Sequence, residues 1–353
     1  MVSNILPVAA LAGAAMAACP LSVELTGATG HVAQVAVTNT ANEAITVFKG
    51  NTVLLDHATK DLVVEDASGN ALPFEGSFVK YRRTNIAPEM FQTIQPGETV
   101  NTEVNAATTY KLAGVASAKV NALQGFHYVT GAAAPTSLKE TAYCEATSNQ
   151  MTIVPDQSKV AAEHLLARAE PVFNSRIQKR TVKYSSCSSA DQASLQTSVA
   201  DAISMAKAAA TAASSAAYYF TTWFKSTSVE STVKAIYTDI TGVQTTSPTI
   251  SCTDTYRGCT DGSALLYTVP SANYIVPCPD NGYWDFPELA DNCADDDYDK
   301  GGSILHEVSH LYGTDDYAYG QTAAKQLTAS QAAANADTYE IYAGSVRLGG
   351  CSS

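Results

Sequence analysis

The chain has 353 residues, about twice the usual length of one domain, and 46% of its residues are hydrophobic whereas 16% are charged. This balance excludes a chain that is disordered throughout. The 34 acidic residues outnumber the 21 basic ones and give a formal charge of −13, which argues against a protein that binds nucleic acid by neutralising phosphates. We therefore expect about two folded units and no nucleic-acid partner.

The first apolar segment, residues 5–18, is too short for the roughly 20 residues of a membrane-spanning helix. Ala15 and Ala17 supply the small-residue pattern that precedes a signal-peptide cleavage site, although the segment lacks a basic start. We expect residues 1–18 to be a signal peptide and the protein to be secreted and extracellular, with no membrane partner. The alternative is an N-terminal core strand.

From about residue 21 to residue 154, short runs of alternating apolar residues are separated by turn residues. Examples are residues 31–39, 45–55, 61–74 and 78–85. This period favours antiparallel strands, and we expect a β-sandwich whose two ends are tied together by Cys19 and Cys144.

A dibasic pair, Lys179-Arg180, divides the eight cysteines into groups of two and six. Each part could therefore close its own disulfides in an oxidising compartment and still separate after a cut. The preceding residues 155–180 are charged and rich in helix formers, which is typical of an exposed linker. We expect cleavage at this pair of basic residues, although two ordinary surface cations would look the same.

The second half changes to helical spacing. A capping pattern at Ser188 and Asp191 opens an Ala-rich stretch that predicts two long packed helices, ending in an aromatic cluster that we interpret as core: Tyr218, Tyr219, Phe220, Trp223 and Phe224. Further helices are predicted at residues 229–240, 303–311 and 322–346, and two strands at 263–269 and 272–278. The fold class is therefore α+β, with a mainly helical second half that has a small β region.

Only two histidines lie beyond residue 180, and they frame a glutamate in the sequence His306-Glu307-Val308-Ser309-His310. On a helix, positions i and i+4 lie on one face about 6 Å apart, so both imidazoles can reach one metal ion. This H-E-x-x-H pattern is the zinc-peptidase arrangement, in which the glutamate acts as general base.

A catalytic zinc site takes three protein ligands and leaves a position for water. No third histidine exists in the second half, so a carboxylate must complete the site if this half binds the metal alone; the candidates are Asp315, Asp316, Asp337 and Glu340. Asp316 follows Gly313, where the chain can fold back from the helix end. Glu340 follows 30 residues after His310 on the last predicted helix.

Residues 313–320, GTDDYAYG, fit the pattern G-T-x-D-x-x-Y-G. This is the second signature of the deuterolysin-like fungal metallopeptidases called aspzincins, which the chain resembles over its whole length. The resemblance implies a zincin-type catalytic domain at residues 181–353, made as a zymogen behind a propeptide at 19–180. The interval between His310 and Gly313 is closer to that of related peptidyl-Lys endopeptidases than to that of deuterolysin itself.

Carried over to this sequence, the resemblance makes His306, His310 and Asp316 the ligands of one Zn²⁺ per catalytic domain. It makes Glu307 the base and Tyr319 a phenol near the substrate oxyanion. It also implies a monomeric zinc metalloendopeptidase that acts on protein substrates, a propeptide that serves as intramolecular inhibitor or folding aid, and three disulfides: Cys187–Cys252, Cys259–Cys278 and Cys293–Cys351.

An acidic run before the metal helix comprises Asp291, Asp295, Asp296, Asp297 and Asp299. It is either a solvated loop or a feature that attracts basic proteins, for which deuterolysins have a preference, and a deep acidic subsite for lysine is a further option. Two other hypotheses remain: a zinc peptidase with Glu340 as the third ligand, and a disulfide-rich secreted acidic binding protein without catalysis.

Overall fold

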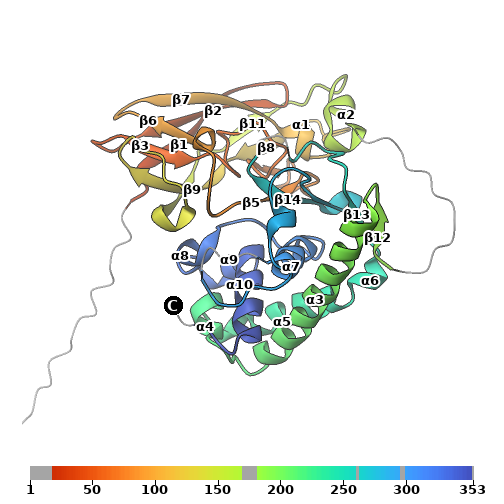
Figure 1. Cartoon of the computed structure of the whole chain (residues 1–353). Coiled ribbons are helices and arrows are strands. Elements are labelled where there is room, and N and C mark those ends of the chain that lie inside the picture. The colour runs from red at the N-terminus through yellow and green to blue at the C-terminus, as the bar shows by residue number, and fades with distance from the viewer. Residues whose placement is uncertain (1–17, 169–180, 260–261, 295–298, 352–353) are drawn as a thin grey trace, which may run out of the picture.

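The computed structural model describes residues 18–168, 181–259, 262–294 and 299–351. The predicted signal peptide up to residue 17, the Lys179-Arg180 pair and residues 295–297 of the acidic run lie outside the described residues. In Figure 1 the β-rich N-terminal half lies above the helical C-terminal half. Within the described ranges, no helix is long and apolar enough to span a bilayer.

The N-terminal half contains three antiparallel sheets. Their strand orders are β1-β2-β7, β10-β9-β3-β6 and β11-β8-β4. The bounds are β1 (Leu21–Thr29), β2 (Val32–Asn39), β3 (Ile45–Phe48), β4 (Val63–Glu65), β6 (Phe91–Ile94), β7 (Thr99–Asn105), β8 (Ala118–Asn121), β9 (Leu123–Thr130), β10 (Ala142–Thr147) and β11 (Met151–Ile153). Inward-facing residues of these strands, among them Val23, Val35, Val47 and Phe126, form one shared core, as the alternating pattern predicts.

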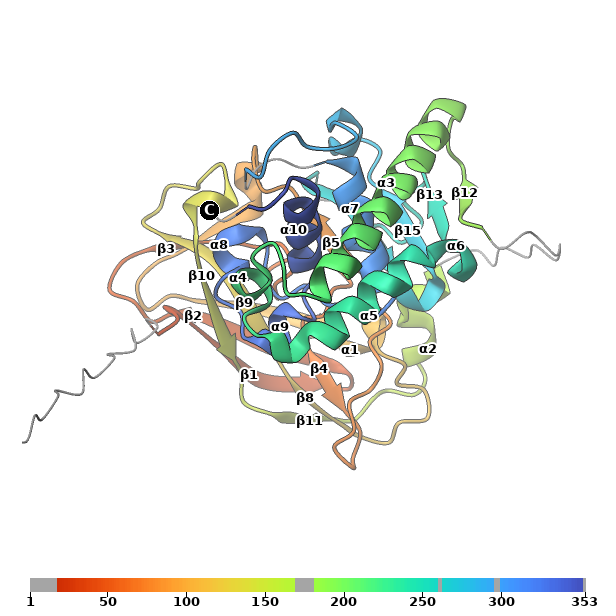
Figure 2. The ribbon, with the colours of Figure 1, turned by 90° about the horizontal axis from the view of Figure 1, so that it is seen from below.

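The short helical segments of this half are α1 (Ala106–Thr109), α2 (Val160–Glu163), η1 (Pro88–Met90), η2 (Leu138–Glu140) and η3 (Leu165–Arg168). The C-terminal half contains α3 (Ser189–Ala213), α4 (Phe220–Phe224), α5 (Glu230–Thr241), α6 (Val243–Thr246), α7 (Lys300–His310), α8 (Gly320–Ala324), α9 (Ala329–Ala332) and α10 (Ala336–Arg347), with 3₁₀ turns η4 (Thr227–Val229), η5 (Pro270–Ala272) and η6 (Tyr283–Asp285). Helix α3 packs against α5, α7 and α10, and Figure 2 shows α3 and α5 side by side.

Two helix predictions need correction. The Ala-rich stretch forms one long helix, α3, followed by the short α4, because the chain turns at Tyr218 and Tyr219, which have positive φ angles. These two tyrosines are exposed, whereas the rest of the aromatic cluster is buried. The single helix expected at 322–346 is divided into α8, α9 and α10, since a capping box between Thr328 and Gln331 starts a new helix.

A five-stranded sheet joins the two halves. Its order is β12 (Lys183–Ser185), β13 (Thr249–Ser251), β15 (Tyr274–Pro277), β14 (Ala264–Val269) and β5 (Phe78–Tyr81). Strand β5 belongs to the N-terminal half and pairs antiparallel with β14. All four β5 residues are buried, and a third core continues across this junction with residues of both halves, including Phe48, Tyr267 and Tyr319.

All eight cysteines are paired. The pairs are Cys19–Cys144 in the N-terminal half and Cys187–Cys252, Cys259–Cys278 and Cys293–Cys351 in the C-terminal half. The four predicted disulfides are therefore confirmed, and none of them joins one half to the other.

Candidate active site

Helix α7 carries the H-E-x-x-H sequence and begins at a buried cap. The Asp299 carboxylate accepts hydrogen bonds from the backbone N–H groups of Gly302 and Ala290, so this member of the acidic run is a helix cap rather than a solvated charge. A Cβ at Gly302 would lie 3.3 Å from the Glu340 side chain. Glycine therefore allows α10 to lie against α7.

The structure brings His306, His310 and Asp316 together. Oδ1 of Asp316 lies 3.3 Å from Nε2 of His306 and 3.5 Å from Nε2 of His310. One ligand atom from each of the three residues lies within 4.8 Å of the others. This is the set of two imidazoles and one carboxylate that the sequence analysis expected.

A hydrogen bond from Nδ1, the nitrogen that faces away from Asp316, fixes the orientation of the His310 ring. Its Nδ1 lies 3.1 Å from the backbone carbonyl oxygen of Thr314, which can only accept a hydrogen bond. The proton therefore resides on Nδ1, and Nε2 keeps its lone pair, which is the form that binds a metal ion.

Nothing in the described part of the chain forms a hydrogen bond to Nε2 of His306, Nε2 of His310 or either carboxylate oxygen of Asp316, and all four atoms are buried. A buried polar atom without a partner is destabilising by about 1–3 kcal/mol. Nitrogen and carboxylate ligands at one buried point are the donors that zinc prefers. The residues present thus fit a zinc ion.

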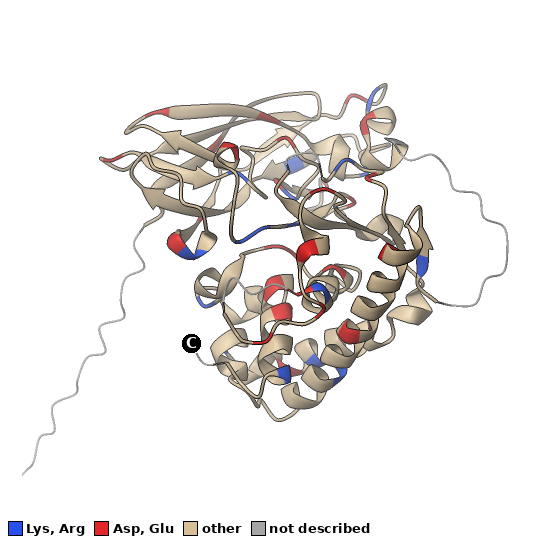
Figure 3. Ribbon diagram, in the orientation of Figure 1, with Lys and Arg blue, Asp and Glu red and all other residues tan. Residues whose placement is uncertain are grey.

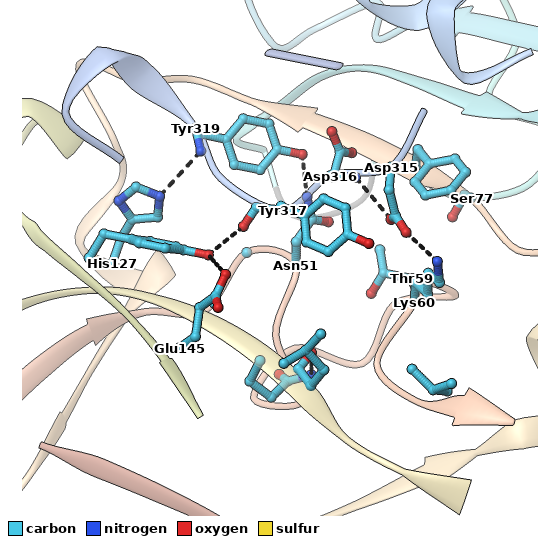
Figure 4. Close-up of a pocket in the computed structure, with 17 residues that line it drawn as sticks. Asn51, Thr59, Lys60, Ser77, His127, Glu145, Asp315, Asp316, Tyr317 and Tyr319 are labelled. Carbon is cyan, nitrogen blue, oxygen red and sulfur yellow. Dashed lines mark hydrogen bonds and ion pairs between the residues drawn. The ribbon is translucent and has the colours of Figure 1, made fainter. Parts of the chain in front are cut away.

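The loop between α7 and α8 places Asp316. Gly313 has a φ angle of +95°, which lets the chain reverse directly after the helix. Further along the loop, the Asn335 side chain accepts from the N–H groups of Tyr317 (2.9 Å) and Ala318 (3.1 Å). In Figure 4 the Asp316 carboxylate lies beside the Tyr319 ring, whereas the Asp315 carboxylate points to Lys60.

Glu307 lies on the same helix between the two histidines. Its Oε2 accepts a hydrogen bond from the Thr268 hydroxyl at 2.7 Å, and its Oε1 is buried without a partner among the described residues. Burial raises the pKa of Glu307 to about 7. Thr268 comes from β14, so this strand orients the carboxylate.

Tyr319 is fully enclosed between the two halves. Its hydroxyl donates a hydrogen bond to the backbone carbonyl oxygen of Val79 at 2.8 Å, and the same oxygen accepts from the Asn51 side chain at 2.9 Å. Burial, together with the charge of Asp316, raises the pKa of Tyr319 well above its usual value. The phenol therefore remains a hydrogen-bond donor to a carbonyl group.

The other candidate carboxylates lie elsewhere. Asp337 and Glu340 approach the opposite nitrogen of His306, and each has a carboxylate oxygen 3.6 Å from Nδ1. A second possible metal group consists of these three residues. However, both carboxylates are already paired with cations of the N-terminal half.

Those cations were missed by the sequence analysis. The Lys80 ammonium, whose side chain is 0% exposed, contacts Glu340 and lies 3.6 Å from Asp337. Arg83 lies 3.5 Å from Asp337 and 3.4 Å from Glu340. Figure 3 shows the basic stretch of β5 between the halves, next to acidic stretches of the C-terminal half. No motif or spacing in the sequence marks either cation.

Comparison with known proteins identifies the family of this chain. Residues 209–344 match the aspzincin family model, described as lysine-specific metallo-endopeptidase. A neutral protease 2 homolog of Sclerotinia sclerotiorum is 33% identical, with 93% of this chain and 90% of that protein covered. The chain belongs to the aspzincin family. The enzyme is thus a zinc metalloendopeptidase, and the hypothesis of a binding protein without catalysis is wrong.

Other members of the family also align along nearly the whole enzyme. A neutral protease 2 homolog of Phaeosphaeria nodorum is 32% identical over 98% of this chain and 99% of its own length. The homolog of Aspergillus terreus is 33% identical over 93% of this chain and 91% of its own. The similarity therefore includes the N-terminal half as well as the half that carries the site.

Proposed function

We propose that residues 181–353 form a secreted, monomeric endopeptidase and that His306, His310 and Asp316 hold its single Zn²⁺. The observation that carries this assignment is the meeting of three buried ligand atoms that have no other partner in the described part of the chain. The runner-up, with Glu340 in place of Asp316, is less well supported because the Glu340 carboxylate is engaged by Lys80.

In this proposal, three residues of the chain have different roles in peptide hydrolysis. A zinc ion held there supplies a Lewis acid that polarises a carbonyl group and makes water more acidic. Glu307 takes a proton from the attacking water and later delivers it to the leaving amine. Tyr319 donates a hydrogen bond to the carbonyl oxygen as negative charge develops on it. Thr268 keeps the Glu307 carboxylate in place.

We further propose a preference for basic substrates, with lysine following the bond that is cut. Asp337 and Glu340 are two buried carboxylates on α10 beside the catalytic helix, and they accept a lysine ammonium from the N-terminal half. The description of the matching family model agrees with this preference.

The N-terminal half, residues 19–180, is proposed to be a propeptide that inhibits the enzyme, with residues 1–18 as signal peptide and processing at Lys179-Arg180. Two observations support a propeptide role. Each half closes its own disulfides, and residues of the N-terminal half contact Tyr319, Asp337 and Glu340.

The test uses the full chain, expressed for secretion and loaded with zinc. We expect the mature N-terminus at Thr181, one zinc per molecule, and hydrolysis of casein and protamine that a chelator abolishes. The Glu307→Gln variant should keep its metal and lose hydrolysis. Absence of cleavage in processed, zinc-loaded protein, or full activity of Glu307→Gln, would contradict the proposal.

A further inference from the structure

We propose that the enzyme cuts its own N-terminal half at the bond between Val79 and Lys80. The inference rests on the proposed function, since it takes Glu307 and Tyr319 as catalytic residues. It goes further by assigning a second cleavage site, 100 residues away from the dibasic pair, to the enzyme itself.

The backbone of β5 is held as an added edge strand. It runs antiparallel to β14, with Phe78 opposite Thr268 and Val79 opposite Tyr267. Thr268 is also the residue that holds the Glu307 carboxylate. An extended peptide added to a sheet edge is a common mode of peptide recognition, in which main-chain hydrogen bonds fix the register. The register thus places this segment beside the general base.

The side chains that flank the bond show where it lies. The Phe78 ring is stacked on the imidazole of His310, with 4.3 Å between the centroids and 7° between the planes. On the other side, Lys80 reaches the carboxylates that lie 3.6 Å from Nδ1 of His306. The residues on either side of Val79 therefore contact His310 and the carboxylates next to His306.

The Val79 carbonyl group has the hydrogen-bond environment expected for the carbonyl group of a bound substrate. Its oxygen accepts hydrogen bonds from the Tyr319 hydroxyl (2.8 Å) and from the Asn51 amide (2.9 Å). Two donors on one carbonyl oxygen are the arrangement that stabilises a developing oxyanion. Val79 and Lys80 are both 0% exposed, so bulk water does not compete for these contacts.

Lys80 supplies the recognition element. Its ammonium group is buried against Glu340 and Asp337, the same carboxylates that we propose for a substrate lysine. Lys80 directly follows Val79 in the sequence. An enzyme that cuts before lysine would therefore hydrolyse the Val79–Lys80 bond.

The reaction needs only water. The water oxygen forms a bond to the Val79 carbonyl carbon, and the bond from that carbon to the Lys80 nitrogen breaks. Val79 becomes a carboxylate and Lys80 gains a free α-amino group, while Glu307 transfers the proton to the leaving nitrogen. No oxidant or co-reactant takes part.

Cleavage here would not separate the pieces at once. Cys19 precedes the bond and Cys144 follows it, and the two are joined in a disulfide. The fragments would therefore remain covalently linked and appear as separate species only after reduction.

The experiment uses the zinc-loaded full chain, sampled over time after zinc is added to chelator-treated protein. The samples are reduced and analysed by intact mass and N-terminal sequencing. We expect a new N-terminus at Lys80, formed at a rate that does not depend on protein concentration. The Leu138–Lys139 bond, whose lysine is exposed and far from any acidic pair, serves as internal control and should stay intact.

Variants separate the contributions. Lys80→Ala should slow the cut by about 100-fold, the usual effect of removing one partner of a buried charge pair. Lys139→Ala should leave the rate unchanged, and Glu307→Gln should abolish the cut. Circular dichroism shows whether Lys80→Ala is folded. If it is not, comparison of the wild type with Glu307→Gln still decides whether the enzyme cuts itself.

The outcomes distinguish the two proposals. An enzyme that hydrolyses casein but leaves Val79–Lys80 intact overturns self-cleavage and leaves the proposed function standing. A cut that persists in Glu307→Gln also overturns self-cleavage, because a different protease must then be responsible. A zinc-loaded, processed protein that cleaves neither casein nor itself overturns both.

Discussion

Two adjacent carboxylates, Asp315 and Asp316, have opposite environments. Asp315 pairs with Lys60 at the surface of the junction, whereas Asp316 is turned toward the imidazoles of His306 and His310. Adjacent residues on an extended loop point to opposite sides, so only one of the pair can share a centre with the histidines. Sequence alone left four carboxylates open because it does not give the course of the loop.

The first prediction concerns the third ligand. Asp316→Asn should weaken zinc binding by at least about 100-fold, since even changes behind the ligands cost 10–100-fold. Glu340→Gln should keep the metal and lose the preference for lysine substrates. Zinc content after dialysis and a peptide-library cleavage assay measure the two effects. The reverse result, with metal lost only in Glu340→Gln, would favour Glu340 as the ligand.

The second prediction concerns a buried acid in the N-terminal half. Burial raises the pKa of Asp61 to about 7, against an unperturbed value of 3.8. Ionisation of Asp61 therefore destabilises the folded state increasingly as the pH rises from about 4 to about 7. Asp61→Asn should stabilise the protein by ~4 kcal/mol at pH 8 and by less than ~1 kcal/mol at pH 4.

Denaturant unfolding of both proteins at the two pH values measures this difference. The exposed Asp291 serves as control, because its replacement by Asn should change the free energy of unfolding by less than about 0.5 kcal/mol. A gain for Asp61→Asn that is equal at both pH values would show that the carboxyl group does not titrate as described.

At the scale of elements, the loop from α7 to α8 depends on one side chain. Asn335 is 0% exposed and makes hydrogen bonds to Tyr317, Ala318 and Thr338. These bonds connect the start of α10 to the loop that carries Asp316. The position of a proposed ligand is thus set by a residue 19 positions later in the sequence.

The third prediction follows from this connection. Asn335→Ala should destabilise the protein by ~3 kcal/mol, since it leaves several buried backbone groups unpaired, and should lower both zinc affinity and kcat. Asn292→Ala is the control, because Asn292 is exposed and accepts a hydrogen bond from the nearby N–H of Ala294. Thermal unfolding, zinc titration and casein hydrolysis give the three readouts. Unchanged zinc affinity in a destabilised Asn335→Ala protein would refute the positioning role.

Prediction from the sequence succeeded where structure is local. The i, i+4 spacing of His306 and His310 placed both on one face of α7, and the four alternating runs named in the N-terminal half contain β2, β3, β4 and β5. The pairing of β5 with β14 was not predicted, because it joins residues about 190 positions apart and no local pattern encodes a partner. Lys80 was missed for a related reason: lysine is rarely buried, and only the folded chain brings the carboxylates that neutralise it.

At the scale of the whole molecule, the two halves meet at a buried histidine. Nε2 of His127 lies 3.4 Å from the backbone nitrogen of Tyr319, and its Nδ1 lies 3.1 Å from the Thr141 hydroxyl. The centroids of the His127 and Tyr143 rings are 5.2 Å apart. Burial lowers the pKa of His127 to about 4, although the charge of Asp337 acts in the opposite direction. The imidazole is therefore neutral in the joined molecule at neutral pH.

The fourth prediction uses this shift. In a separated N-terminal half, His127 loses its contact with Tyr319, and we expect its pKa to rise toward the ordinary value of 6.5. The separated half then takes up a proton at a higher pH than the joined form does. Association should weaken as the pH falls from about 6.5 to about 4, by up to ~3 kcal/mol, or about 100-fold. After cleavage at the dibasic pair, co-elution of the halves should decrease with acid. His127→Gln should reduce this pH dependence; equal pH profiles for both proteins would exclude His127 as the cause.

The five-stranded sheet has a consequence for how the proposed activation is measured. The C-terminal half enters the sheet at β12 and the N-terminal half enters it at β5, on opposite edges with β13, β15 and β14 between them. A protease that severs the connection ahead of β12 leaves every hydrogen bond between β5 and β14 intact. Scission and the separation of β5 from β14 are thus distinct events with distinct rates. A denaturing gel, which reports only scission, would overcount the active molecules.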